Sequence, residues 1–317
     1  MAEVNLRRVL VVDDEPHVVS AVQRELNGPP FEFYEYAVEG FSVPEAALRR
    51  AAEVDFDAVI SDYRMPGMDG IAFLGELARL RPDCMRIVLS GQTDMDTLTR
   101  LVNESHIYRF IAKPWSAHAL KAALAQALDY GAVLRENRRL AEQARQGGGE
   151  LPTGGDDAIA QILIVDDDME VLSSLTRSLR QHALVDDLVA AIRGEAGHRG
   201  VSASAGRFAI QASPSAEHAL GLAESVDFAC VVADFRMPDM NGVEFLKRLA
   251  LLRPDCSRIL VSGNIGRDDL ARAVNQAHIF AFLDKPWSDF ELKTSVLLGV
   301  ARQRLLRENR ALAALAD

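Results

Sequence analysis

The stretch VLVVDDE at residues 9–15 returns as ILIVDDD at residues 162–168. Three more stretches return later in the chain, in the same order. They are SDYRMPGMDG (61–70) with ADFRMPDMNG (233–242), RPDCMRIVLSG (81–91) with RPDCSRILVSG (253–263), and IYRFIAKPWS (107–116) with IFAFLDKPWS (279–288). Self-similarity over this many segments is typical of a duplicated unit. The sequence therefore predicts two domains of one architecture in tandem.

Short apolar runs alternate with segments of helical period within each copy. In the first copy the runs are VLVV (9–12), DAVIS (57–61), RIVLS (86–90) and YRFIA (108–112). Nearly continuous apolar runs are typical of parallel strands that are covered on both faces. Amphipathic helices are predicted between and after them, with apolar positions at Ile71, Leu74, Leu77, Ala78 and Leu80, and at Leu120, Leu124 and Leu128. This alternation predicts an α/β fold with a doubly wound parallel sheet in each copy.

The second copy is longer than the first near its beginning. Asp13 and Asp166 are 153 positions apart, whereas Asp62 and Asp234 are 172 apart, so the second copy has gained 19 residues. The added residues fall between the first helix and the second strand. We expect an extended helix, with apolar positions at Leu184, Leu188 and Ile192, and then a loop, HRGVSASAG (198–206). Such a connection lies at the amino ends of the strands, away from a site at their carboxyl ends.

A Gly-rich tract separates the two copies. GGGELPTGG at residues 147–155 cannot continue a helix, whereas the pattern before it is helical from about Ala119 to Gln146. A helix of that length projects beyond its domain, since it rises about 1.5 Å per residue. We therefore expect a first domain over 5–130, a helical extension and linker over 131–157, a second domain over 158–303 and a helical tail over 304–317.

Both helical extensions carry the segment RENR. The simplest interpretation is a charged, solvated helix face. The alternative is a short coiled coil, in which a polar asparagine fixes the register of an apolar seam. The positions on that seam are Val133, Asn137 and Leu140 in the first copy and Leu305, Asn309 and Leu312 in the second. A homodimer through these helices and an internal pairing of the two domains both remain open.

Composition restricts the class of protein. With 35 basic and 46 acidic residues the net charge is −11 and no basic run occurs, so nucleic acid is not an expected partner. The three cysteines form no CxxC pair, which favours a reducing compartment over disulfides or zinc. No apolar run is long enough for a signal peptide or a membrane span. We expect a cytoplasmic protein that has no contact with a membrane.

Chemically capable side chains follow the strands of each copy. They are Asp13, Asp14, Asp62, Ser90 and Lys113 in the first copy, and Asp166, Asp167, Asp234, Ser262 and Lys285 in the second. Carboxylates that converge at one sheet edge repel one another unless a cation lies among them. Mg²⁺ suits such a site, because it takes few carboxylates and leaves positions open for phosphate oxygens. A lysine and a hydroxyl can bind those oxygens, so the pattern predicts a phosphoryl site in each copy.

This order of an acidic pair, a D-x-x-M-P-x-M-[DN]-G loop, a serine and a Lys-Pro resembles the receiver domain of two-component response regulators. The resemblance covers both halves and implies two flavodoxin-like (βα)5 domains, each with an extended C-terminal helix. It implies that Asp62 and Asp234 are the phosphoacceptors. It implies further ligands of Mg²⁺, namely Asp13, Asp14, Asp166, Asp167 and the backbone carbonyls of Arg64 and Arg236. It implies a switch hydroxyl, an aromatic switch residue and a phosphate-binding lysine in each domain, namely Ser90, Phe110 and Lys113, and Ser262, Phe282 and Lys285.

The function implied is signalling rather than enzymatic turnover. A sensor histidine kinase or a histidine phosphotransfer protein would supply the phosphoryl group, and a downstream protein would bind the switched surface. We expect no DNA-binding effector. The alternatives are a phosphate sink, a relay intermediate, an inactive scaffold and a hydrolase of the haloacid dehalogenase type. A hydrolase of that type needs a second aspartate two residues after the nucleophile, where this chain has Arg64 and Arg236.

Overall fold

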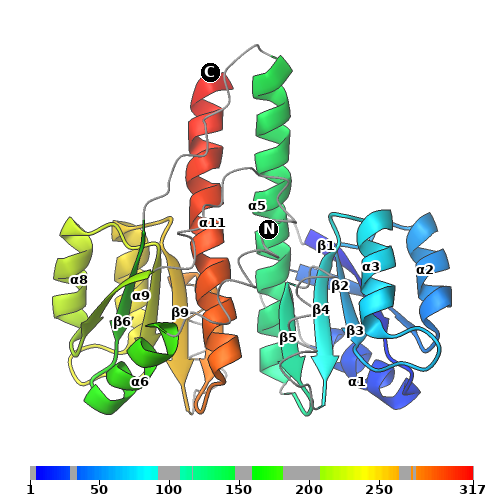
Figure 1. Ribbon diagram of the computed structural model, residues 1–317, viewed down its shortest axis with the longest axis horizontal. Helices are drawn as coiled ribbons and strands as arrows, with labels where there is room; N and C mark the ends of the chain where they lie inside the picture. The colour runs from blue at the N-terminus through cyan, green and yellow to red at the C-terminus, as the bar shows by residue number, and fades with distance from the viewer. Residues whose placement is uncertain are drawn as a thin grey trace. The chain divides into compact units, whose positions relative to one another are not determined.

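The computed structural model describes residues 5–28, 34–91, 108–115, 117–146, 159–180, 208–263, 273 and 276–316. The chain divides into two compact units, Met1–Ala132 and Val133–Asp317 (Figure 1). Among the described residues, no helix is long and apolar enough to cross a membrane.

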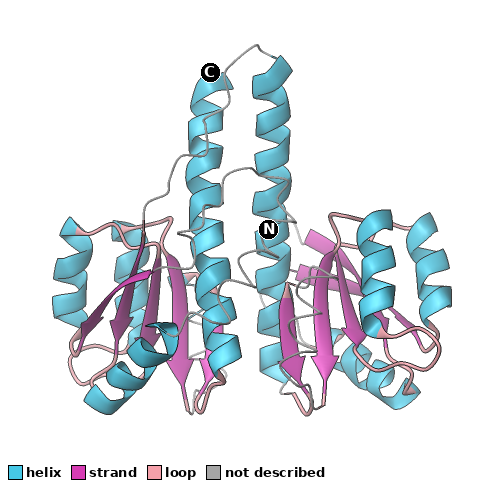
Figure 2. Cartoon of the chain, viewed as in Figure 1, coloured by secondary structure: helices cyan, strands magenta, loops and turns pink. Residues whose placement is uncertain are grey.

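A parallel five-stranded sheet with the order β2-β1-β3-β4-β5 forms the centre of the first unit (Figures 1 and 2). Its strands are β1 (Asn5–Val12), β2 (Tyr34–Phe41), β3 (Ala58–Asp62), β4 (Met85–Ser90) and β5 (Arg109–Ala112). The described helices are α1 (Pro16–Leu26), α2 (Pro44–Glu53), α3 (Gly70–Leu80) and α5 (Ala117–Gln146). Each apolar run that predicted a strand lies within one of these strands or differs from it by one residue.

The second unit contains a sheet of the same order, β7-β6-β8-β9-β10. Its strands are β6 (Ala160–Val165), β7 (Phe208–Ser213), β8 (Cys230–Asp234), β9 (Ser257–Ser262) and β10 (Ala281–Asp284). The described helices are α6 (Met169–Arg180), α8 (Ala216–Ser225), α9 (Gly242–Leu252) and α11 (Asp289–Ala316). Two flavodoxin-like domains in tandem are thus confirmed. The predicted insertion, including Leu184, Leu188 and Ile192, lies outside the described residues, between α6 and β7.

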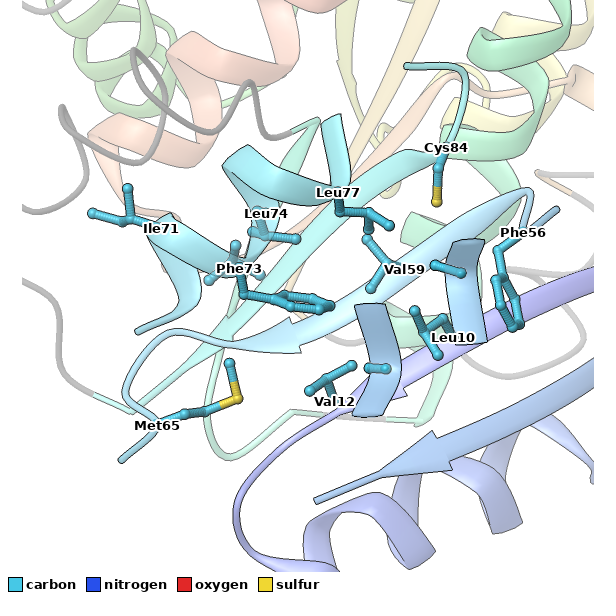
Figure 3. Packing of buried hydrophobic residues seen from close by; sticks show 13 residues of the cluster. Leu10, Val12, Phe56, Val59, Met65, Ile71, Phe73, Leu74, Leu77 and Cys84 are labelled. Carbon is cyan, nitrogen blue, oxygen red and sulfur yellow. The ribbon is translucent and has the colours of Figure 1, made fainter. Parts of the chain in front are cut away.

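Side chains of α2 and α3 pack in one buried cluster with those of the first sheet, and Figure 3 shows the contribution of α3. Leu10 and Val12 of β1 are two positions apart and therefore lie on the same face, where Phe73 and Leu74 of α3 pack in the same buried cluster. Full burial of one such side chain stabilises the fold by about 1.5–3 kcal/mol. The predicted apolar positions of α3 were wrong at Leu80, which is 41% exposed. Phe73, which was not among them, is fully buried.

The repeated RPDC segment has a structural role. In the first unit, Arg81 donates from Nε to the carbonyl oxygen of Ala51 at 2.7 Å and from Nη2 to that of Ala52 at 3.1 Å. These carbonyls belong to the last turn of α2, where no helical N–H is left to bond them. Arg253 makes the same two bonds at the end of α8, to Ala223 and Glu224. Each arginine thus holds the helix that precedes the acceptor strand of its domain, α2 before β3 and α8 before β8.

Candidate functional site

Asp13, Asp62 and Lys113 meet at the carboxyl edge of the first sheet. Asp13 directly follows β1, and Asp62 is the last residue of the adjacent strand β3. Lys113 directly follows β5, so its side chain must cross the position of β4. Its Nζ lies 2.7 Å from Oδ2 of Asp13 and 2.5 Å from Oδ1 of Asp62. Three segments far apart in the sequence therefore share one cationic group.

A backbone amide holds the second oxygen of each carboxylate. The N–H of Glu15 donates to Oδ1 of Asp13 at 3.0 Å, and the N–H of Arg64 donates to Oδ2 of Asp62 at 2.7 Å. Each carboxylate therefore has one oxygen on the lysine and the other on the main chain. This arrangement fixes both carboxylate groups before any ligand binds, which lowers the entropic cost of a reaction at Asp62.

The second domain reproduces this geometry. Nζ of Lys285 lies 2.9 Å from Oδ2 of Asp166 and 2.6 Å from Oδ1 of Asp234. The N–H of Asp168 donates to Oδ1 of Asp166 at 2.9 Å, and the N–H of Arg236 donates to Oδ2 of Asp234 at 2.5 Å. The equivalent oxygens have the equivalent partners in both domains, so both sites have the lysine contacts and the amide contacts.

The carboxylates of both sites are buried, whereas Lys113 and Lys285 are partly exposed. Burial alone would lower the pKa of each ammonium group, but the hydrogen bonds to the aspartates raise it overall. Both lysines are therefore charged at neutral pH.

Lys285 does not fully offset the effect of burial on Asp166. Burial raises its pKa, although the hydrogen bonds from Lys285 and from the amide of Asp168 act in the opposite direction. The charge of Asp234 adds to the increase in pKa. A second positive charge nearby would favour the ionised form of Asp166.

The donor set at this edge suits a hard divalent cation. Mg²⁺ is usually bound through one or two carboxylates, with waters completing its octahedral shell. Asp13 and Asp62 supply two carboxylates that both contact Nζ of Lys113. Asp14, the residue after Asp13, is partly exposed. No group of three or more His, Cys, Asp or Glu side chains in the described part of the chain is spaced to hold a metal ion. The residues present therefore fit a Mg²⁺ ion that takes two carboxylates and several waters. Asp167, the counterpart of Asp14, is exposed.

The predicted switch residues lie on the two strands that follow the acceptor strand in the sheet, the serine at the end of one and the phenylalanine within the other. Ser262 is the last residue of β9, and Phe282 lies within β10; both are buried. Ser90 and Phe110 occupy the equivalent positions of β4 and β5, and their side chains lie outside the described part of the structure. The peptide bonds Lys113–Pro114 and Lys285–Pro286 are both cis.

Two glycines of the acceptor loops have a role that the sequence analysis missed. The N–H of Gly70 donates to the carbonyl oxygen of Tyr63 at 2.8 Å, and that of Gly242 to Phe235 at 2.9 Å, so each loop closes on itself. Both glycines are buried and begin the helix after the loop. A methyl group on Gly70 would overlap the carbonyl oxygen of Asp62. Their recurrence at the end of both acceptor motifs was the available signal.

A further contact distinguishes the second site from the first. Oγ of Ser215, the residue before α8, donates to Oδ2 of Asp239 in the acceptor loop at 2.8 Å, and the N–H of Glu217 donates to the same oxygen at 3.3 Å. The first domain has Val43 and Gly67 at these two positions. Only the second acceptor loop therefore has this bond to its neighbouring loop.

Comparison with known proteins assigns the two halves to one family. The family model of the response regulator receiver domain matches residues 9–125 and 198–297, more than half of the chain. A solved signal receiver domain of an HD domain-containing protein from Pseudomonas fluorescens Pf-5 is 30% identical, with a TM-score of 0.37, and covers 40% of this chain and 98% of that chain.

Among curated proteins, the hydrogenase transcriptional regulatory protein HoxA of Cupriavidus necator is 36% identical over 132 residues, which are 42% of this chain and 26% of HoxA. The C4-dicarboxylate transport transcriptional regulatory protein DctD of Rhizobium meliloti is 31% identical over 170 residues, 52% of this chain and 36% of DctD. The chain thus spans about a quarter to a third of the length of these relatives.

This similarity corrects one expectation. We expected no DNA-binding effector, but the relatives that match are transcriptional regulatory proteins. Net charge describes the chain as a whole and does not identify the process that a receiver domain controls. The expectation that no DNA-binding effector is involved is therefore corrected, and nucleic acid is no longer excluded as a target.

Proposed function

Because the chain belongs to the response regulator family and carries two receiver domains in tandem, we propose that Asp62 and Asp234 each accept a phosphoryl group from a phosphohistidine. The observation that carries this proposal is the duplicated contact of each acceptor with a lysine, at 2.5 Å in the first domain and 2.6 Å in the second. The donor would be a sensor histidine kinase or a histidine phosphotransfer protein.

In the proposed reaction, a carboxylate oxygen of Asp62 attacks the phosphorus in line with the bond to the imidazole nitrogen. The O–P bond forms as the P–N bond breaks, and the imidazole leaves with the electron pair of that bond and takes up a proton from solvent. Lys113 moves its charge from the carboxylates toward the transferring phosphoryl oxygens, where negative charge is spread in the transition state. The N–H of Arg64 holds the other carboxylate oxygen and so keeps the attacking oxygen oriented.

We propose that Mg²⁺ is bound by Asp13 and Asp62 in the first domain and by Asp166 and Asp234 in the second. Asp14, Asp167 and the backbone carbonyls of Arg64 and Arg236 are the further ligands that the family resemblance implies. When bound, the ion supplies charge neutralisation for the phosphoryl oxygens.

Ser262 and Phe282 are proposed as the residues that report phosphorylation of the second site, with Ser90 and Phe110 in the same roles in the first. The chain itself would be a phosphoryl acceptor and not an enzyme with a separate substrate. A cytoplasmic location fits the three cysteines, which are all free and buried. The names of the curated relatives support control of transcription as the process in which the chain acts.

The test of phosphoryl acceptance is labelling with a small phosphodonor and Mg²⁺, followed by intact-mass measurement. The wild type is expected to gain up to two phosphoryl groups, and Asp62→Asn and Asp234→Asn are each expected to lose one. Asp69→Asn is the matched control, because it changes an aspartate of the same loop to the residue that the second domain has there, Asn241. Labelling of the double acceptor variant at the wild-type level would refute the assignment.

The output is tested in cells. Transcript levels are compared between a strain with both acceptors replaced by asparagine and a strain with Asp69→Asn. A transcript change confined to the acceptor variant supports control of transcription, whereas identical transcripts in the two strains contradict it.

A further inference from the structure

The C-terminal half of α5 and the whole of α11 belong to the same compact unit, Val133–Asp317. Leu140, Ala141 and Ala144 of α5 form a buried apolar cluster with Leu312 of α11, and Ala313 packs against it. Leu312 is fully buried in a single chain. The two helical extensions are therefore in contact with one another.

The buried positions of the two helices have the spacing of a coiled coil. On α5, Asn137 and Ala144 are buried seven residues apart, with Leu140 between them. On α11, Leu305 and Leu312 are buried seven residues apart. A repeat of seven residues keeps one seam on the partner when two helices supercoil. Both helices therefore present a seam rather than a single contact.

The contacts also give the direction and the register of the pair. Nδ2 of Asn309 donates a hydrogen bond to the carbonyl oxygen of Val133 at 3.2 Å. Seven residues further along α5, Leu140 packs in the same cluster as Leu312. Contacts advance in the same direction on both helices, so the helices are parallel. Leu140 and Leu312 are equivalent positions of the two copies, so the pairing is in register.

Asn137 and Asn309 are the polar residues of this seam. Asn137 is 1% exposed and lies on α5 between Val133 and Leu140, which both contact α11. A polar residue at such a position weakens a coiled coil but allows only the register in which the amide finds a partner. The bond from Asn309 to the main chain of Val133 is a partner of that kind, and a shift by one heptad would break it.

We propose that residues 133–146 and 302–316 form a parallel, in-register coiled coil within one chain, whose register is set by Asn137 and Asn309. The seam of each helix is then covered by the other copy's extension in the same chain. A second chain is not needed to bury it, so these helices are not the dimer interface that the sequence also allowed.

Paired cysteines test the proposal in the full-length chain. The native cysteines are free and buried, so oxidation reports on introduced pairs. Leu140→Cys/Leu312→Cys is expected to form one disulfide within a chain that stays monomeric on a non-reducing gel and by light scattering. Leu140→Cys/Leu305→Cys is the mismatched control, because one heptad is about 10 Å of helix rise and a disulfide spans Cα atoms about 4.4–6.8 Å apart. Val133→Cys/Leu305→Cys is a second matched pair, used if the first variant does not fold.

Mixing separates pairing within a chain from pairing between chains. Leu140→Cys and Leu312→Cys are made in separate chains, unfolded together, refolded and oxidised. The proposal expects almost no disulfide-linked dimer in this mixture. Abundant linked dimer, or failure of both matched pairs to cross-link in folded protein, would overturn it.

The role of the asparagines is tested in the mismatched variant. Adding Asn137→Leu/Asn309→Leu to it removes the residues that restrict the register. The proposal expects the mismatched disulfide to increase several-fold as shifted registers become populated. An unchanged yield, with the matched pair still cross-linking, would show that the asparagines do not set the register.

Discussion

Gly242 lies so close to the carbonyl oxygen of Asp234 that a methyl group on its Cα would overlap that oxygen. Any side chain introduced at position 242 would therefore push against the backbone of the proposed phosphoacceptor. We expect Gly242→Ala to displace Asp234, to abolish its labelling by a small phosphodonor and to destabilise the second domain by about 1–3 kcal/mol.

Gly221 provides the control for this substitution. It lies in α8 of the same domain, is exposed, and has no atom within 4 Å of an added Cβ. Gly221→Ala is expected to stabilise its helix by up to about 1 kcal/mol, because alanine has a higher helix propensity than glycine. Mass spectrometry measures labelling and urea titration measures stability. Normal labelling of Asp234 in Gly242→Ala would contradict the predicted displacement.

Removing a site lysine is expected to slow labelling in its own domain only. In Lys285→Met, Asp166 and Asp234 lose the group that both of them contact, at 2.9 and 2.6 Å. We expect labelling of Asp234 to slow about 10²-fold or more, as when one preorganised donor is removed from an active site. Asp62 in the same chain is the internal control, and Lys247→Met removes an exposed lysine of α9. Equal slowing at Asp62 would mean that the lysine acts on global stability instead.

The repeated motifs predicted much of this site because they lie where parallel strands end. Asp13, Asp62 and Lys113 are each the last residue of a strand or the one after it, so the sheet order alone brings them to one edge. The role of Arg81 could not be predicted in this way. Its guanidinium bonds Ala51, thirty positions away, and this contact depends on how α2 lies beside the RPDC loop.

The burial of α3 shows a second limit. Leu80 follows Ile71 by nine residues, which is two and a half turns of helix, so it lies on the opposite side of α3 from Ile71 and is 41% exposed. The number of apolar residues in a helical segment therefore does not by itself identify the buried positions, which depend on the angle of each residue around the helix. Phe73, which was not among the predicted positions, is fully buried in the core instead.

The bond from Ser215 to Asp239 is expected to make the second domain more sensitive to a substitution just before α8 than the first domain is to one just before α2. Ser215 accepts the N–H of His218 at 3.3 Å and donates to Asp239 at 2.8 Å. Loss of a helix-capping serine costs about 0.5–2 kcal/mol, so Ser215→Ala should destabilise the second domain by that amount. Val43, at the same position of the first domain, is 52% exposed, and Val43→Ala should change stability by less than about 0.5 kcal/mol.

Tryptophan fluorescence can follow the two domains separately during this test. The chain has two tryptophans, Trp115 in the first domain and Trp287 in the second. Urea titration of each variant in a Trp115→Phe or Trp287→Phe background therefore reports one domain at a time. Equal effects of Ser215→Ala and Val43→Ala on their own domains would show that the contact with Asp239 contributes nothing.

The native thiols are expected to be inert in the folded protein and to make it less stable in alkali. Burial raises the pKa of Cys84 and of Cys256 to about 12, from the ordinary value of 9.0. Because the folded-state pKa lies above the unfolded one, the contribution of these thiols to stability is fully present below about pH 9. It is lost progressively as the pH rises toward 12.

Alkylation tests whether the thiols are buried. Iodoacetamide at pH 8 should modify the three cysteines only after unfolding, whereas Leu251→Cys, at a position that is 84% exposed, should react at once. Native Cys256 reacting as fast as the introduced Leu251→Cys thiol would show that its side chain is accessible and that the burial argument is wrong.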